Sequence, residues 1–436
     1  MAKGSAKKQR KFAQAQARKL AASQAVPSSC DVLLVGAGAS GLLCALEASS
    51  LAAEKSILLM EAKPILGAPI LATGNGRCNF CHEPLESSAY NHPSWMEEFF
   101  SAAARLWPKS TPSELVQDYF GKLGLLSTSH EGRLYPRSLV AASVRDLLLA
   151  QLEASTVKVA TLRDVVAVEP CEQGFCVRYQ ERFREDPLAP EGWARRSLHA
   201  RRVVLATGGD TLSAIEGLDL PLVPCEPVLC PVEIETELCQ RLDGHRAKAR
   251  VRAYSPCSEP LFDEYGEVLF RSSDSSQKGV LSGIVAYNLS RLVTPGDSVV
   301  LDLLPECTHE QVAALLMRGG SYNPRHLDGA LDPAVAHALL PQAIDDDGAA
   351  TLFSAVEAVK SATFCVSGKA FVQSAQVSRG GLSLDALTLP SLEVSAYPGL
   401  YVLGEALDID GACGGYNLGF AWFSGLVCGH ALAQKD

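Results

Sequence analysis

The sequence lacks an apolar run long enough to cross a membrane. Its longest apolar stretch, around residues 420–433, contains Ser424 and His430 and falls short of the roughly 20 residues that a membrane helix needs. No apolar segment follows the basic residues near the start, as a secretory signal requires. The 14 cysteines are scattered, so most are expected to be reduced core thiols. We therefore expect a cytoplasmic protein that does not engage a membrane.

Acidic residues are missing from residues 1–29, which carry seven basic residues, Lys3, Lys7, Lys8, Arg10, Lys11, Arg18 and Lys19. Because the whole chain has a net charge of −10, the rest carries −17. An acidic body does not suit a nucleic-acid enzyme. Residues 1–29 are predicted to be a basic, disordered tail. Contact of this tail with RNA or a partner protein is the alternative.

A dinucleotide-binding pattern follows the tail in "DVLLVGAGASGLLCALEASSLAAEKSILLMEAK". A short apolar strand at residues 31–35 leads into Gly36-x-Gly38-x-x-Gly41, and a helix and a second strand, residues 56–60, come next. The glycines permit a tight turn, close approach of a pyrophosphate and packing of the helix on the strand. Glu61 ends the second strand, where its carboxylate can accept hydrogen bonds from a ribose.

The end of the chain favours FAD over NAD as the cofactor. Residues 399–433 again form a strand, a Gly404-Glu405 turn, a glycine cluster and an apolar helix. A flavin needs a second set of polar contacts beyond its pyrophosphate, and a C-terminal segment commonly supplies them. A helix that begins near Asn417 would direct its positive end towards the flavin pyrimidine. The "VVLATGG" stretch, a strand followed by a glycine turn, is a third piece.

Seven stretches resemble the HI0933-like flavoproteins, also described as aminoacetone-oxidase-like or NAD(P)/FAD-dependent oxidoreductases. They read VGAGASGLLCAL, LATGNGRCNF, EGRLYPRS, VVLATGG, LDLLP, VSRGGLSL and GLYVLGEALDIDGACGGYNL. The resemblance implies an α/β fold with a Rossmann-like FAD-binding domain, built on the GxGxxG βαβ unit, at residues 30–215 and 360–436. A β-rich plus helical inserted domain, residues 216–359, interrupts it and is expected to select the substrate or close over it.

The resemblance also implies non-covalent FAD and, for some members, reduction of conjugated C=C bonds in steroid-like substrates. The implied FAD-binding residues lie in the matched motifs or beside them and are Gly36, Gly38, Ser40, Gly41, Glu61, Ala62, Lys63, Gly76, Arg77, Cys78, Asn79, Val165, Ala206, Thr207, Gly208, Gly404, Glu405, Asp410, Asn417 and Leu418. Val165 is placed where related flavoproteins contact adenine through the backbone.

The stretch "LATGNGRCNFC", residues 71–81, is expected to cross the flavin. Its glycines let the backbone approach the cofactor, and Arg77 can bind a pyrophosphate or a polarised ring edge. An Asn-Gly turn between two strands is the simpler alternative. Cys78 and Cys81 could also form a redox dithiol, although no second GxGxxG accompanies them. No second C-x-x-C and no H-x₃-H is present, so no metal site is predicted.

These patterns predict an FAD-dependent oxidoreductase that passes a hydride to or from a small organic substrate. Electrons would come from NAD(P)H that binds transiently or from a redox partner protein. Reduction of a C=C bond needs a proton donor, and the candidates are Cys78, Tyr135 and Tyr416. Two alternatives stay open: an amine-type oxidase that uses O₂, and a non-catalytic FAD-binding redox sensor whose tail binds RNA or a partner.

Overall fold

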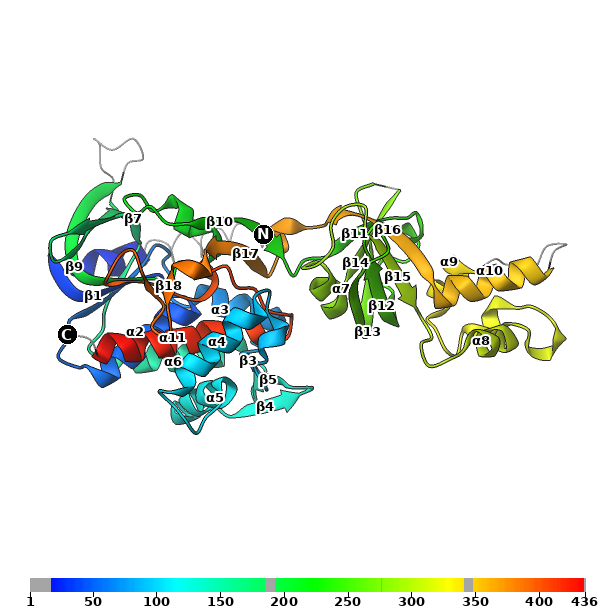
Figure 1. The fold of residues 1–436 in the computed structure, drawn as a ribbon, viewed down its shortest axis with the longest axis horizontal. Coiled ribbons are helices and arrows are strands. Elements are labelled where there is room, and N and C mark those ends of the chain that lie inside the picture. Colours follow the sequence, from blue (N-terminus) through cyan, green and yellow to red (C-terminus); the bar gives the residue numbers. More distant parts are fainter. Residues whose placement is uncertain (1–16, 185–192, 276, 341–347, 435–436) are drawn as a thin grey trace, which may run out of the picture. The chain divides into compact units, whose positions relative to one another are not determined.

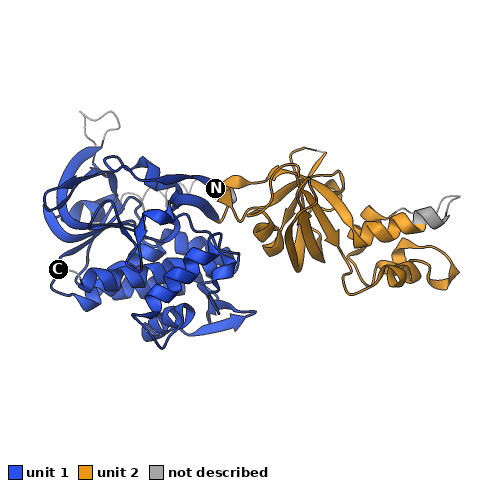
Figure 2. Cartoon of the chain, viewed as in Figure 1, with its two compact units in different colours: residues 1–226, 377–436 blue, residues 227–376 orange. Residues whose placement is uncertain are grey.

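A computed structural model describes residues 17–184, 193–275, 277–340 and 348–434. The chain divides into two compact units, residues 1–226 with 377–436 (unit 1) and residues 227–376 (unit 2). Figure 2 colours the two units separately. The unit borders therefore fall at 226/227 and 376/377, whereas the sequence placed the inserted domain at 216–359. The functional division of the chain stays a prediction.

Unit 1 is built on a nine-stranded sheet with the order β18-β19-β20-β9-β1-β2-β6, and β7 and β8 continue it from β9. The central strands pair in parallel: β1 with β2 and β9, β2 with β6, and β20 with β9. The strands of unit 1 are β1 (Ser29–Val35), β2 (Ile57–Glu61), β3 (Cys81–His82), β4 (Ser127–His130), β5 (Arg133–Pro136), β6 (Lys158–Thr161), β7 (Arg163–Cys171), β8 (Gly174–Glu181), β9 (Ala194–Leu205), β17 (Val377–Leu382), β18 (Leu387–Thr388), β19 (Glu393–Val394) and β20 (Leu400–Val402), and β10 (Leu222–Val228) crosses the unit border.

Two helices from opposite ends of the sequence pack together in unit 1. Figure 1 shows α11 (Tyr416–Gln434) lying lengthwise beside α2 (Ala39–Leu51). A Cβ on Gly425 would lie 2.6 Å from the carbonyl oxygen of Ser40, so the absence of a side chain lets the two helices approach closely. The other helices of unit 1 are α3 (Ala68–Ala72), α4 (Pro93–Ala104), α5 (Pro112–Lys122) and α6 (Ala141–Glu153).

Unit 2 contains a closed barrel of six strands in the order β11-β14-β13-β12-β15-β16. Small and branched apolar residues alternate with charged ones along β12, which puts Ala249 and Val251 inside and Arg250 outside. The strands are β11 (Val232–Glu235), β12 (Arg246–Tyr254), β13 (Pro260–Ser272), β14 (Lys278–Ser282), β15 (Ser298–Asp302) and β16 (Ala362–Lys369), and the helices are α7 (Ile284–Leu289), α8 (His309–Leu316), α9 (Pro333–Leu339) and α10 (Gly348–Lys360).

This architecture confirms the predicted fold class, a Rossmann-type unit accompanied by a β-rich and helical one. The predicted disordered tail, however, is too long. Residues 17–23 are helical, and Ala21 is fully buried. The segment is ordered because the buried guanidinium of Arg163 holds it by its carbonyl groups. Residues 1–16 lie outside the described residues.

Candidate active site

The first glycine motif forms a tight turn. The backbone conformation at Gly36 and the close packing at Gly41 permit only glycine at these two positions. Gly36 has φ +102°, and a Cβ on Gly41 would lie 2.0 Å from the carbonyl oxygen of Gly36. A Cβ on Gly38 would meet nothing within 4 Å, so the space beside it is open. α2 begins at Ala39 without a side-chain cap or an acidic first turn. Its free N–H groups therefore suit a pyrophosphate.

Glu61 lies at the carboxyl end of β2 and is held in place by the backbone. Its Oε2 accepts a hydrogen bond from the N–H of Ala37 at 2.9 Å, and its Oε1 accepts one from the N–H of Lys63 at 2.8 Å. A carboxylate has about four lone-pair sites, so capacity remains for ribose hydroxyls. Ala62 follows directly in the chain. Val165, on β7, lies four residues after Thr161, which pairs with Glu61.

The "ATGG" turn lies beside the glycine motif. The N–H of Ala206 donates to the carbonyl of Val35 at 2.9 Å. Thr207 follows, and Gly208 has φ +81° with open space around its Cβ position. A Cβ on Gly36 would meet the Ala206 carbonyl oxygen at 2.4 Å. Strand ends that are far apart in sequence thus form one surface at the carboxyl edge of the sheet, where ligands of open α/β sheets bind.

The C-terminal Gly404-Glu405 turn reaches the same surface. A Cβ on Gly404 would lie 2.7 Å from Oγ of Ser40, which brings the two predicted cofactor segments together. Glu405 accepts a hydrogen bond from the N–H of Ser378 at 2.8 Å. Burial raises the pKa of Glu405 above its usual value, since a charged carboxylate is poorly solvated there.

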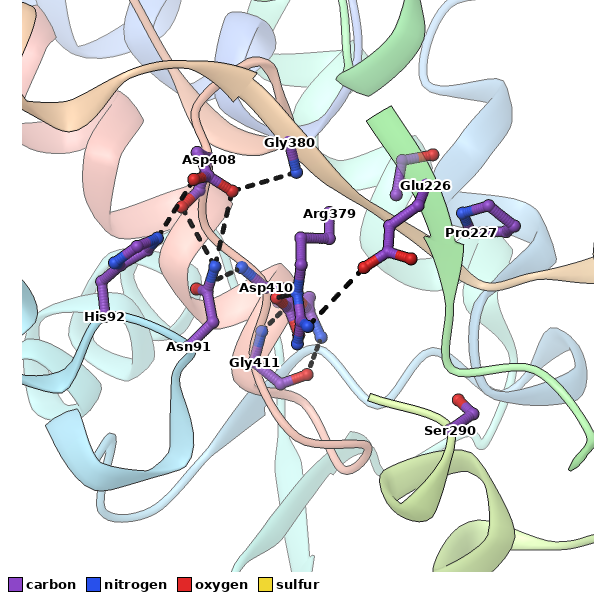
Figure 3. A network of polar contacts seen from close by, with 12 residues as sticks. Asn91, His92, Glu226, Pro227, Ser290, Arg379, Gly380, Asp408, Asp410 and Gly411 are labelled. Atoms are coloured by element: carbon purple, nitrogen blue, oxygen red, sulfur yellow. Dashed lines mark hydrogen bonds and ion pairs between the residues drawn. The ribbon is translucent and has the colours of Figure 1, made fainter. Parts of the chain in front are cut away.

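A network of polar contacts holds the loop of residues 408–411 (Figure 3). Asp410 is fully buried, and Arg379 donates to it from Nε at 2.6 Å and from Nη2 at 3.1 Å. Asn91 accepts from the N–H of Asp410 at 2.9 Å and donates to the carbonyl of Asp408 at 3.3 Å. Nε2 of His92 lies 3.1 Å from Oδ2 of Asp408. The loop is therefore fixed from two other segments of the chain.

Sequence reasoning missed Asn91, His92 and Arg379. Arg379 lies inside the matched "VSRGGLSL" string, so the signal for it was present. Asn91 and His92 belong to no motif, and only their contacts reveal them.

The side chain of Asn417, a predicted flavin contact, forms two hydrogen bonds to the backbone of Gly411, and its contact with flavin stays a prediction. Its Oδ1 accepts from the N–H of Gly411 and its Nδ2 donates to the carbonyl of Gly411, both at 2.8 Å. The side-chain amide thus closes the loop on itself. α11 begins at Tyr416, so the backbone N–H groups of Asn417 and the half-buried Leu418 lie in its first turn, where donors have no partner within the helix.

The start of α11 and the "GRCN" loop together leave an acceptor atom for a ligand. Oδ1 of Asn79 is buried and has no hydrogen-bond partner among the described residues. A Cβ on Gly415 would lie 2.6 Å from that atom, so the close approach requires glycine. The pyrimidine end of FAD carries an N–H donor that would satisfy such an acceptor. With the open phosphate turn and the held Glu61, the residues present fit FAD.

The loop of residues 71–81 is not an Asn-Gly turn between two strands. α3 precedes it, and residues 73–76 form a short 3₁₀ turn in which Asn75 has φ +53°. Gly76, at φ +82°, has open space around its Cβ position, and Arg77 is exposed. The alternative prediction of an Asn-Gly turn between two strands is therefore wrong.

Both cysteines of the loop are buried thiols. Burial raises the pKa of Cys78 to about 11 and that of Cys81 to about 12. A Cβ on Gly419 would lie 3.2 Å from Sγ of Cys81, which therefore packs against α11. Because the thiolate is the reactive form, this environment favours structural thiols over a redox dithiol.

Two of the three candidate proton donors are tyrosines near the loop. The ring of Tyr416 stacks on His82 with centroids 4.3 Å apart, and burial raises the pKa of Tyr416 to about 12. Tyr135 lies on β5 opposite Thr128. Its neighbour Leu134 pairs with Cys81, so β5 runs alongside the predicted flavin loop.

Two absences concern the part of the chain that the structure describes. No group of three or more His, Cys, Asp or Glu side chains there could hold a metal ion. Among the same residues, no helix has both the length and the apolar character to cross a membrane.

Comparison with known proteins identifies the family of the chain. The family model described as the HI0933-like protein Rossmann domain matches residues 30–431. A 3-dehydro-bile acid delta(4,6)-reductase of Clostridium scindens is 30% identical over 430 residues, which covers 92% of this chain and 98% of that protein. A ribosomal RNA dihydrouridine synthase of Escherichia coli is 25% identical over 427 residues, with coverage of 92% and 98%.

Among solved structures, the similarity is lower. The quinol fumarate reductase of Escherichia coli is 12% identical, with a TM-score of 0.44, and the alignment covers 93% of this chain and 70% of that one. The match of the family model to nearly the whole chain decides the assignment. This chain belongs to the HI0933-like family and is an FAD-dependent oxidoreductase.

Proposed function

We propose that the protein reduces a C=C bond that is conjugated to a carbonyl group in a small organic molecule. The observation that carries this proposal is the 30% identity, over 92% of this chain, to a 3-dehydro-bile acid delta(4,6)-reductase. A 3-dehydro group is a ketone, and a double bond at position 4 is conjugated to it. Dihydrouridine synthesis, the activity named for the Escherichia coli relative, saturates a uracil double bond that is also conjugated to a carbonyl.

When bound, FAD supplies a hydride from N5 to the carbon at the far end of the conjugated system. The chain itself must then do three things. It must orient the substrate, polarise its carbonyl oxygen and deliver a proton to the carbon beside the carbonyl. The two electrons for the reduction would come from NAD(P)H or from a redox partner protein.

Tyr416 is the proton donor that the geometry supports best. A phenol with a pKa of about 12 stays protonated at neutral pH and can donate. Its ring is fixed by stacking on His82, at the N-terminal end of α11. Cys78 is fully buried, which restricts access to a substrate. Tyr135 remains a second proposed donor because β5 lies beside the loop.

Unit 2 is proposed to select the substrate, as the resemblance implied, but not by a field of positive charge. β12 carries four basic residues, Arg246, Lys248, Arg250 and Arg252, and such a row of positive charges can steer acidic substrates. Arg246 pairs with Glu267, and Arg250 donates to Asp263 at 2.7 and 2.9 Å. Because these acids neutralise them, the strand favours neither a strongly anionic substrate nor RNA.

An anaerobic experiment tests the proposed reaction. The purified protein is titrated with NADH and NADPH while flavin absorbance is followed, and the reduced protein is then mixed with a 3-oxo-4-ene steroid, a uridine-containing RNA, an amine panel or O₂. We expect rapid reoxidation by the enone and a product heavier by two hydrogens. Reoxidation only by O₂ with peroxide release would support the oxidase instead. A flavin inert to every donor, with salt-sensitive RNA binding that depends on residues 1–29, would support the sensor.

A further inference from the structure

A segment ahead of the matched family region packs against the cofactor unit. Residues 17–28, called the strap below, comprise a helix at 17–23 and an extended stretch that leads into β1. Ala21 is fully buried, and Val26 packs against the core of unit 1. The family model matches from residue 30, so the strap lies outside the matched region.

Arg163, a buried residue at the start of β7, fastens the strap. Its Nη2 donates to the carbonyls of Ala21 and Gln24, each at 3.2 Å. Its Nη1 donates to the carbonyl of Thr161 at 2.9 Å. The carboxylate of Glu181 lies 3.8 Å from its Nε and balances its charge. One cation therefore links the strap to the turn between β6 and β7.

The side chain of Gln24 makes a second link at the same place. Its Oε1 accepts from the N–H of Thr161 at 2.7 Å and from the Thr161 hydroxyl at 3.1 Å. Both of these groups are donors, so the amide oxygen faces Thr161 and the amide nitrogen, Nε2, points elsewhere. Within the described residues that nitrogen has no hydrogen bond.

The sheet places this link at the ligand end of unit 1. Thr161 is the last residue of β6 and pairs with Glu61, the last residue of β2. Ser29 is the first residue of the parallel strand β1 and so lies at the opposite end of the sheet. Residues 25–28 must therefore run along the sheet, which leaves Gln24 at the carboxyl edge, one strand from Glu61.

We propose that the strap is part of the adenosine site, with Gln24 as a further binding residue. Glu61 would accept hydrogen bonds from the ribose, and the turn of residues 161–165 lies next to Glu61. The Nε2 donor of Gln24 matches the ring nitrogens of adenine, which accept hydrogen bonds. The strap thus strengthens binding of the adenosine half of FAD and leaves the flavin half unaffected. This inference does not depend on which substrate is reduced.

Two deletions separate the strap from the basic residues before it. The apoprotein is prepared without residues 2–16 or without residues 2–27, and binding of FAD and FMN is measured by quenching of flavin fluorescence. Removal of residues 2–16 should leave both affinities unchanged. Removal of residues 2–27 should weaken FAD binding by about tenfold, the upper end for the loss of one hydrogen bond, and leave FMN binding unchanged. FMN lacks adenosine, so it is the chemical control.

A point variant keeps the test valid if the longer deletion fails to fold. Gln24→Ala should weaken FAD by about fivefold without weakening FMN, whereas Ser23→Ala, which removes only a local bond to Leu20, should change neither. The affinity for ADP should fall by the same factor as the affinity for FAD, since ADP contains the adenosine half. Equal loss of FAD and FMN, or a folded Gln24→Ala protein with unchanged affinity for FAD and ADP, would overturn the proposal.

Discussion

Units 1 and 2 satisfy their buried polar groups in different ways. In the described chain, the buried side-chain atoms without a hydrogen-bond partner, Oδ1 of Asn79, Nε of Arg163 and Oε2 of Glu181, all belong to unit 1. In unit 2, the buried Lys360 donates to the carbonyls of Leu304 and Cys307 at 2.7 and 2.6 Å and pairs with Asp302. Arg163 and Glu181 also form an ion pair with each other, so among these atoms Oδ1 of Asn79, in the predicted flavin loop, is the one that we propose a ligand satisfies.

One ion pair from each unit shows how burial changes the effect of a charge. Arg250 and Asp263 of unit 2 form an ion pair exposed to water, where screening leaves it little influence on stability. Arg379 and Asp410 of unit 1 form a pair in which the carboxylate is fully buried. Burial makes the second pair costly to disturb. Substitutions of matched residues in the two units should therefore differ sharply.

The largest difference is expected between the two arginines. Arg379→Ala removes the guanidinium that holds a buried carboxylate and should lower the free energy of unfolding by about 3–5 kcal/mol. Arg250→Ala should cause no detectable change. Urea denaturation followed by fluorescence measures both. The double variant Arg379→Met with Asp410→Asn should recover most of the loss, and similar losses for the two arginines would contradict the comparison.

A somewhat smaller difference is expected between two glycines. Gly41→Ala introduces a Cβ 2.0 Å from a backbone oxygen of the phosphate turn, so α2 must move. It should cost about 3 kcal/mol and release FAD. Gly329→Ala in unit 2 meets nothing within 4 Å and should leave both properties unchanged. Calorimetric melting and the flavin content of the purified proteins check this. A Gly41→Ala protein that retains FAD would contradict the proposal that this turn binds the cofactor.

The smallest effects concern pH and have opposite signs for one carboxyl group of each unit, Glu405 and Asp332. Burial raises the pKa of Glu405, so its contribution is present below the ordinary glutamate pKa and is lost as pH rises through the raised value. The hydrogen bond from His245 lowers the pKa of Asp332, so that contribution is present above the ordinary aspartate pKa and is lost as pH falls through the lowered value.

Melting curves from about pH 3 to pH 8 test these signs. Glu405→Gln should gain stability relative to the parent as pH rises, and Asp332→Asn should lose less than the parent on acidification. Curves of the two variants that run parallel to the parent would show that these carboxyl groups do not set the pH dependence.

The sequence predicted the parts of the site that local patterns determine. The strand, the glycine turn, α2 and Glu61 follow one another within about 30 residues, and each has a pattern of its own. The end of the chain was recognisable for the same reason. Ser40 and Gly404 were both named, although only packing brings them together.

The rest of the site depends on pairs that are distant in sequence. Asn91 accepts a hydrogen bond from the backbone of Asp410, which lies 319 residues away in the sequence. No local sequence pattern predicts such a contact. The strap was assigned to a disordered tail because Ala, Gln and Lys dominate residues 1–29 as a whole. Its order comes from Arg163, 139 residues beyond Gln24. Asn417 was placed at the correct end of α11, but its partner in this structure is Gly411.

Reconstitution of the apoprotein with FAD tests the central claim most directly, namely that the two ends of the chain converge on one cofactor. Titration followed by absorbance and calorimetry should give one FAD per chain, with binding abolished by Gly41→Ala and weakened by removal of the strap. A folded protein that stays colourless and does not bind FAD would contradict the account.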